Sequence, residues 1–219
     1  NSRVPSILMK STITERQKQL LHIIYGFLTH TGYPPTFEEM REKLDVASNQ
    51  SVTDLLEKLS SQGYVRKGSG ARSLAITPLG YKTLERPVLA PVLGTTAAGL
   101  PVEAVEIPGA WQRLSDQEAR LADEVFMLKI SGDSMINAGI DDGDAVLVQV
   151  RKEFVSGDVV YAQIGDEGTV KRFISEDKPP YVYLKPENPH YGNILFTDSV
   201  ELKGKVVSVL KGNAWYPIR

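Results

Sequence analysis

The sequence contains no cysteine among its 219 residues and only three histidines. The absence of cysteine excludes disulfide bonds, a thiol nucleophile and cysteine-ligated metal sites, and it suits a protein of the reducing cytoplasm. The three histidines, His22, His30 and His190, are scattered along the chain, and none lies near a serine motif. We therefore expect no metal site, no cofactor and no Ser-His-Asp triad.

Long apolar runs are missing as well. No stretch approaches the roughly 18 uninterrupted apolar residues that a membrane helix needs, and residues 1–8 lack the apolar core of a signal peptide. We interpret residues 1–13 as an N-terminal extension that is in part a cloning remnant ahead of Met9. The sequence thus predicts a cytoplasmic protein with no membrane segment.

Charge is unevenly distributed along the chain. Residues 1–87 contain 12 Lys and Arg against 8 Asp and Glu, whereas residues 88–219 contain 13 against 19. A chain of this length, with 42% hydrophobic residues, suits two small domains that each bury a core. The basic first part and acidic second part are a mild indication that only the first part meets a polyanion.

The first part begins with two helix signals. Thr14 and Gln17 have the spacing of a capping box, and so have Thr36 and Glu39. An apolar stripe at helical spacing follows the first box, and the segment 32–35, which reads Gly-Tyr-Pro-Pro, ends that helix. Two helices are therefore expected before residue 45.

A third helix and a hairpin complete the pattern of residues 14–76. Ser48 or Asn49 can cap this helix, which has valine and leucine along one face. Residues 64–67 and 72–76 are expected to be short strands joined by a glycine-rich turn. Short helices joined by a tight turn and followed by a basic hairpin predict a winged helix-turn-helix domain.

The polar face of the third helix and the hairpin supply the candidate DNA contacts. Amides and hydroxyls can meet base edges, whereas arginine, lysine and serine can bind phosphates. The candidates are Ser48, Asn49, Gln50, Thr53, Asp54, Arg66, Lys67, Ser69 and Arg72. The plain alternative is an ordinary solvated face, because polar residues lie opposite the apolar stripe of any surface helix.

The helical period then fades. Residues 77–91 contain three prolines and a glycine, which predicts a semi-extended linker with at most a helical turn near 81–84. In residues 92–219, short apolar runs alternate with glycine-rich turns, which predicts a mostly antiparallel, partly closed sheet. The expected strands are 125–130, 145–150, 159–164, 169–174, 181–184 and 206–210. The fold class is therefore α+β with two domains.

Ser134 and Lys171 are the candidate catalytic pair. A serine needs a base to take its proton, and a lysine can be that base only when burial keeps it neutral. On a strand, Lys171 points the same way as Thr169 and Phe173, so it is desolvated if that face is inward. The alternative is that Lys171 is a charged strand end and that the segment 132–134 is a simple turn.

Several motifs occur in one order along the chain. They are Thr14-Glu15-Arg16-Gln17, Gly32-Tyr33-Pro34-Pro35-Thr36, Leu56-Glu57-Lys58-Leu59, Ala97-Ala98-Gly99, Ser131-Gly132-Asp133-Ser134-Met135, Gly139-Ile140-Asp141-Asp142-Gly143-Asp144, Gly168-Thr169-Val170-Lys171-Arg172 and Leu184-Lys185-Pro186-Glu187-Asn188-Pro189. With them, the chain from about Thr14 to Gly212 resembles the LexA family, the self-cleaving repressors of the bacterial SOS response to DNA damage.

The resemblance implies a role for each matching residue. Ser134 is the nucleophile, Lys171 the general base and Ala98-Gly99 the scissile bond, and the backbone amides of Asp133 and Ser134 form an oxyanion hole. It also implies a homodimer that binds double-stranded operator DNA and regulates transcription of DNA-repair functions. A RecA–single-stranded DNA filament is the expected co-protease.

The chain departs from the family at the recognition helix. The best-known family member carries an asparagine and two glutamates where Gln50, Thr53 and Asp54 stand, so a different operator sequence is expected. Three other functions stay open from the sequence: a phage-type self-cleaving repressor, a peptidase that acts in trans, and a DNA-binding module whose β domain senses a ligand.

Overall fold

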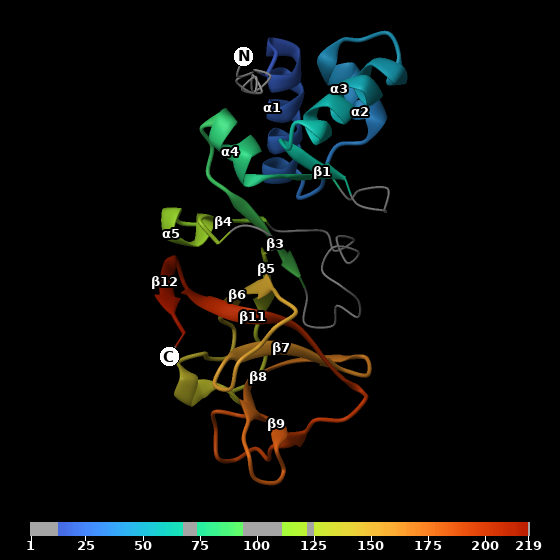
Figure 1. Ribbon diagram of the computed structural model, residues 1–219. Coiled ribbons are helices and arrows are strands. Elements are labelled where there is room, and N and C mark those ends of the chain that lie inside the picture. Colours follow the sequence, from blue (N-terminus) through green and yellow to red (C-terminus); the bar gives the residue numbers. More distant parts are fainter. Residues whose placement is uncertain (1–12, 68–73, 94–110, 122–124, 219) are drawn as a thin grey trace, which may run out of the picture.

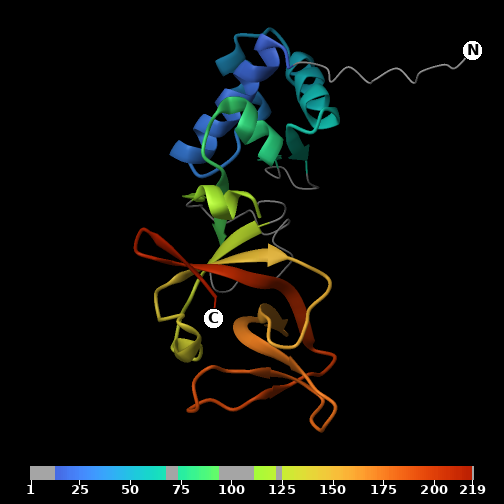
Figure 2. The same ribbon diagram turned by 60° about the vertical axis from the view of Figure 1, so that its left-hand side comes forward.

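The structure, a computed structural model, describes residues 13–67, 74–93, 111–121 and 125–218. A group of helices lies at one end and a β-rich part at the other, with strand β3 (Leu89–Leu93) between them (Figures 1 and 2). This confirms the predicted α+β class. Within these residues, no helix is long and apolar enough to cross a membrane.

The first three helices begin at the capping residues that the sequence indicated. They are α1 (Glu15–His30), α2 (Phe37–Leu44) and α3 (Asn49–Ser61). The Gln17 amide donates to the Thr14 hydroxyl at 3.3 Å, and the Thr14 amide donates to the Gln17 side chain at 2.8 Å. Thr36 and Glu39 form the same reciprocal pair, and the Ser48 hydroxyl caps α3. These bonds satisfy amides that a helix start leaves without partners.

The apolar stripes of the three helices meet in one core. Leu20, Ile24 and Leu28 of α1 pack there with residues of α2 and α3, all almost fully buried. A two-stranded antiparallel hairpin, β1 (Val65–Lys67) with β2 (Leu74–Ile76), closes this core. The arrangement is that of the predicted winged helix-turn-helix.

Residues 77–91 differ from the expected linker. Pro78–Leu84 form helix α4, which Thr77 caps and which begins with proline at a position where a missing amide costs nothing. Tyr81, Leu84 and Leu89 are buried in the core of the helical part. The prolines that suggested a semi-extended linker instead mark a helix start and, at Pro91, a position within β3.

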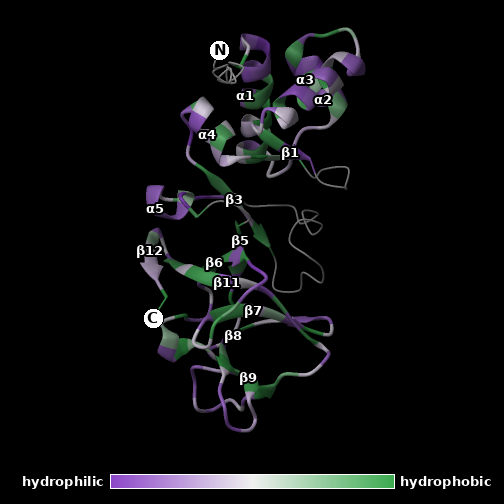
Figure 3. Cartoon of the chain, in the orientation of Figure 1, coloured by the Kyte–Doolittle hydropathy of each residue, from purple (hydrophilic) through white to green (hydrophobic). Residues whose placement is uncertain are grey.

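The β-rich part consists mainly of one mixed sheet of ten described strands. Nine of them follow the order β10-β9-β8-β7-β11-β6-β5-β3-β4, and the tenth, β12, pairs with β11. The strands beyond β3 are β4 (Trp111–Arg113), β5 (Val125–Lys129), β6 (Ala145–Val150), β7 (Val159–Ile164), β8 (Glu167–Ser175), β9 (Val182–Lys185), β10 (Ile194–Leu195), β11 (Val200–Lys211) and β12 (Ala214–Pro217). Apolar residues concentrate on strands such as β5 and β11 (Figure 3). Short helices α5 (Asp116–Ala119) and η1 (Ile136–Ala138) complete the described fold.

Strand β11 holds the two halves of the sheet together. It pairs with β6 and with β7, and its register shifts once along each neighbour. Gly204 lies at the crossing, where an added Cβ would stand 2.6 Å from the carbonyl oxygen of Gln149. This close approach of two backbones requires glycine.

Strand β3 belongs to both parts of the molecule. Leu89 packs in the helical core, whereas Ala90 and Leu93 pack in cores of the sheet. Residues 89–91 pair antiparallel with β4, and residues 92–93 pair parallel with β5. The indole N–H of Trp111, the first residue of β4, donates to the carbonyl of Gly32 at 2.8 Å. This hydrogen bond fastens the sheet to the end of the first helix.

We expect Gly204→Ala to lower the thermal unfolding temperature by several degrees, because the new methyl group must displace the backbone of β6 at a cost of about 1–3 kcal/mol. Thermal unfolding followed by circular dichroism measures the change. Gly192→Ala is the matched control, since a Cβ there meets nothing within 4 Å. Equal unfolding temperatures for the two variants would show that β11 and β6 are not this close.

Candidate active site between strands β5 and β8

The loop that follows β5 carries Ser134 and is fixed by its neighbours. The Ile130 amide donates to the carbonyl of Asp144 at 2.8 Å, which continues the pairing of β5 with β6 by one residue. The backbone then turns at Gly132, whose φ of +92° is rarely adopted by residues with a side chain. The Gly132 amide donates to the Asp142 carboxylate at 2.7 Å. The acidic turn Asp141–Asp144 therefore anchors the serine loop.

Lys171 reaches Ser134 from strand β8. Its side chain lies on the same side of the strand as that of Thr169, as strand alternation predicts, and is only 7% exposed. The Lys171 Nζ lies 2.8 Å from Ser134 Oγ, 2.8 Å from Thr169 Oγ1 and 2.9 Å from the Val170 carbonyl oxygen. The structure thus brings together the two residues that the sequence suggested as nucleophile and base.

Burial lowers the pKa of Lys171 from 10.5 to about 8, because a desolvated ammonium is disfavoured. The three hydrogen-bond partners of Lys171 can bind both its charged and its neutral form. The ammonium donates to all three oxygens, whereas the neutral amine can donate to Thr169 and Val170 and accept from the hydroxyl of Ser134. Loss of the proton therefore requires only that the serine hydroxyl rotate.

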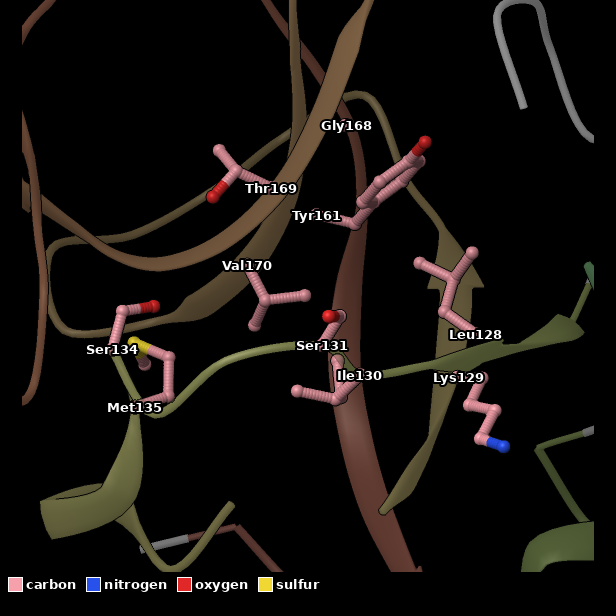
Figure 4. Close-up of a pocket in the computed structure, with 10 residues that line it drawn as sticks. All are labelled: Leu128, Lys129, Ile130, Ser131, Ser134, Met135, Tyr161, Gly168, Thr169 and Val170. Carbon is pink, nitrogen blue, oxygen red and sulfur yellow. The ribbon is translucent and has the colours of Figure 1, made fainter. Parts of the chain in front are cut away.

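A cavity of about 130 Å³ opens beside Ser134. Its lining consists of residues from the end of β5, the serine loop, β7 and β8: Leu128, Lys129, Ile130, Ser131, Ser134, Met135, Tyr161, Gly168, Thr169 and Val170. Ser134 and Met135 line one end of the cavity, and Leu128 and the ring of Tyr161 line the other (Figure 4). The Tyr161 ring lies so close to Gly168 that a Cβ there would be 2.5 Å from the hydroxyl oxygen. The small, partly apolar space suits small side chains of a peptide.

The residues suggested for the oxyanion hole, Asp133 and Ser134, lie in the loop beside this cavity. Within the described chain, no backbone or side-chain acceptor takes the Ser134 amide, so it can meet a developing oxyanion. The suggested scissile pair, Ala98 and Gly99, lies outside the described residues.

Sequence reasoning assigned no role to three side chains around this site. Thr169 accepts from the lysine, and Asn188 and Tyr191 both bind Asp133. Thr169 could have been found from its position two residues before Lys171 on one strand face. The contacts of Asn188 and Tyr191 join segments more than 50 residues apart, and no local pattern indicates such a pairing.

The described DNA-contact candidates lie on the exposed side of α3 and on the hairpin. Asn49 and Gln50 are exposed, and the Gln50 amide donates to the Asp54 carboxylate at 2.8 Å. Thr53 is half-buried and donates to the Asn49 carbonyl. Ser48 caps the helix, and Arg66 and Lys67 are exposed on β1. Ser69 and Arg72 lie outside the described residues.

Comparison with known proteins agrees with this plan of a DNA-binding domain joined to a serine-peptidase domain. Residues 10–73 match the LexA DNA binding domain, and residues 91–207 match the Peptidase S24-like family. The chain is thus a DNA-binding repressor that carries a serine peptidase of this class.

Full-length relatives identify the family more closely. The chain is 34% identical to the LexA repressor of Lactiplantibacillus plantarum over 93% of this chain and 98% of the relative. It is 36% identical to that of Geobacillus kaustophilus, over 91% and 97%, and 37% identical to that of Enterococcus faecalis, over 94% and 99%. The chain belongs to the LexA repressor family, which confirms the resemblance drawn from its motifs.

We expect NMR titration of the intact Ser134→Ala variant to give a pKa near 8 for Lys171, because burial opposes its charge. The free energy of unfolding should also rise as pH increases from 8 to 10.5, because in that range the unfolded chain binds a proton that the folded chain does not. In Lys171→Met that rise should be absent. A Lys171 pKa above 10 would mean that the amine is not desolvated.

Proposed function

We propose that the chain represses the DNA-damage (SOS) response as a dimer on operator DNA, and that it inactivates itself by RecA-stimulated cleavage of Ala98-Gly99. Ser134 is the nucleophile and Lys171 its general base. The observation that carries the proposal is the 2.8 Å contact between Lys171 Nζ and Ser134 Oγ in a buried setting. Membership of the LexA family supports the same assignment.

The proposed reaction has two steps. Neutral Lys171 takes the proton of the Ser134 hydroxyl while Oγ bonds to the carbonyl carbon of Ala98, and the Ser134 amide donates to the oxyanion. The C–N bond then breaks, and the lysine ammonium gives its proton to the departing amine of Gly99. Water, activated by the regenerated amine, hydrolyses the ester between Ser134 and Ala98 and restores the free serine.

The position of Leu93 supports cleavage within one molecule. Leu93, the last residue described before the segment 94–110, pairs with Leu128, which lines the cavity. Ala98 follows five residues later, and a chain of that length spans at most roughly 17 Å. A tethered substrate at this range gains the high effective concentration of an intramolecular reaction.

Regulation then requires two positions of the cleavage segment, one away from Ser134 and one docked on it. A RecA filament stimulates cleavage to the extent that it binds the docked form more tightly. The DNA-binding part of each protomer contacts one half-site, and half-sites lie about 34 Å or a multiple of it apart. Breaking the chain between the DNA-binding part and the dimerising part removes the mutual reinforcement of the two contacts. The reaction takes place in the cytoplasm, where the chromosome lies.

We expect Ser134→Ala and Lys171→Ala to remain intact at alkaline pH while the unchanged protein splits into two fragments. The first variant lacks the nucleophile and the second lacks the base. Gel electrophoresis and mass spectrometry of the fragment ends measure the outcome, with Ser175→Ala and Lys152→Ala as exposed controls that should still split. Cleavage after Ala98 in either Ser134→Ala or Lys171→Ala would refute the assignment.

We also expect the rate of self-cleavage without any partner to rise about tenfold per pH unit below pH 8 and to level off above it. The reason is that the neutral fraction of Lys171 grows in that proportion until its pKa is passed. Fragment formation timed between pH 6 and 10 measures the profile. A rate that does not change with pH would exclude lysine as the base.

A further inference from the structure

The residue before the nucleophile, Asp133, is held by two side chains from a distant segment. The Tyr191 hydroxyl donates to its Oδ1 at 2.5 Å, and the Asn188 amide donates to its Oδ2 at 3.1 Å. The same amide nitrogen lies 3.1 Å from the backbone carbonyl oxygen of Asp133. Asn188 and Tyr191 therefore bind both carboxylate oxygens of Asp133, and Asn188 also binds the backbone of the serine loop.

The segment 187–191, which supplies these contacts, is itself attached to the strand of the base. The Glu187 carboxylate forms an ion pair with Arg172, the neighbour of Lys171 on β8. The Glu187 carbonyl accepts from the Asn137 amide at 2.9 Å, just beyond the serine loop. One short segment therefore contacts both the strand of the base and the loop of the nucleophile.

Asn188 lies at the centre of these contacts. Its side chain is only 6% exposed, and its Oδ1 accepts from the His190 amide at 3.1 Å. The side-chain amide of Asn188 thus donates two hydrogen bonds and accepts one. Among residues of this size only asparagine offers that set, because aspartate lacks the donors and leucine lacks both.

We infer that Asn188, assisted by Tyr191, is a positioning residue that sets the distance between Ser134 and Lys171 through Asp133. The inference rests on the proposed self-cleavage and adds residues that act on the reaction without touching the scissile bond. A loop that turns at a glycine is pliable, and a displacement of about 1 Å at the reacting atoms can cost about 100-fold in rate.

The contacts also control a charge. A carboxylate next to the nucleophile repels an oxyanion that forms at the Ser134 amide. The hydrogen bond from Tyr191, with smaller contributions from the Asp133 amide and Asn188, holds the pKa of Asp133 below its usual value, so it stays ionised. Hydrogen bonds to both oxygens fix the place of this charge and reduce its effect on the reaction.

The first test is Asn188→Ala in the full chain, with self-cleavage timed from pH 6 to 10. We expect the plateau rate at alkaline pH to fall by about 100-fold. The midpoint of the profile should stay near pH 8, and the unfolding temperature should change by only a few degrees, because the burial of Lys171 does not depend on Asn188. A midpoint shifted toward 10.5 would show lost burial instead and would overturn the positioning role.

A charge exchange gives the second test. Asn188→Asp places two carboxylates against each other and should slow cleavage at least as much as Asn188→Ala. The double variant Asp133→Asn with Asn188→Asp restores a donor–acceptor pair with reversed direction and should recover part of the rate. Equal rates for Asn188→Asp and the double variant would refute a contact that acts through Asp133.

The third test removes one oxygen atom. Tyr191→Phe should slow cleavage about two- to fivefold, because Tyr191 is half exposed and water can replace its hydroxyl. Hydrogen bonding to Asp133 raises the pKa of Tyr191, so the hydroxyl keeps its proton in this pH range. Tyr181→Phe, which alters an exposed tyrosine near the start of β9, is the matched control and should not change the rate.

The outcomes separate this inference from the proposed function. If the unchanged protein does not cut itself, or if Ser134→Ala cuts, the proposed function fails. If the unchanged protein cuts, Ser134→Ala does not, and Asn188→Ala cuts at the unchanged plateau rate, only the role of Asn188 fails.

Discussion

The proposed self-cleavage depends on one lysine nitrogen kept out of water beside a serine hydroxyl. In solvent, the ammonium of Lys171 would hold its proton at neutral pH and could not act as a base. In the folded chain, burial on the inner side of β8 brings its pKa to about 8. The cost of that burial is limited because Thr169, Val170 and Ser134 accept hydrogen bonds from the ammonium. The fold therefore holds an amine whose neutral form is populated much more at neutral pH than that of a lysine with its ordinary pKa of 10.5.

The sheet explains how Ser134 and Lys171, which are far apart in sequence, are held next to each other. Ser134 and Lys171 are 37 residues apart in sequence. Lys171 lies on β8 and Ser134 lies in the loop that follows β5, and each of these two strands has neighbours on both sides. Strand β11 pairs with β6 and β7, so it couples the half of the sheet that contains β5 to the half that contains β8. The backbone hydrogen bonds of these strands fix Lys171 and the start of the loop that carries Ser134.

Local features of the fold could be predicted from the sequence, and non-local features could not. The capping boxes at Thr14 and Thr36 involve residues three apart, and the face of Lys171 follows from strand alternation, so both were visible in the residues themselves. Helix α4 was hidden because Pro78 at its start, together with the prolines at 87 and 91 that follow it, is also typical of linkers. Strands β3 and β4 were missed because they are short and are stabilised by partners that the sequence does not indicate. The contacts of Asn188 were missed for the same reason.

The course of β3 has a consequence for what hydrolysis achieves. A break after residue 98 leaves Leu89–Leu93 on the first fragment, yet this strand is hydrogen-bonded to β4 and β5 of the second. The Trp111 indole also joins the second fragment to Gly32 of the first. The immediate product of the proposed cleavage would thus be a nicked complex, and its two fragments would separate only when β3 leaves the sheet. The lifetime of repression after the proposed cleavage would then depend on the dissociation rate of a five-residue strand as well as on the rate of peptide-bond cleavage.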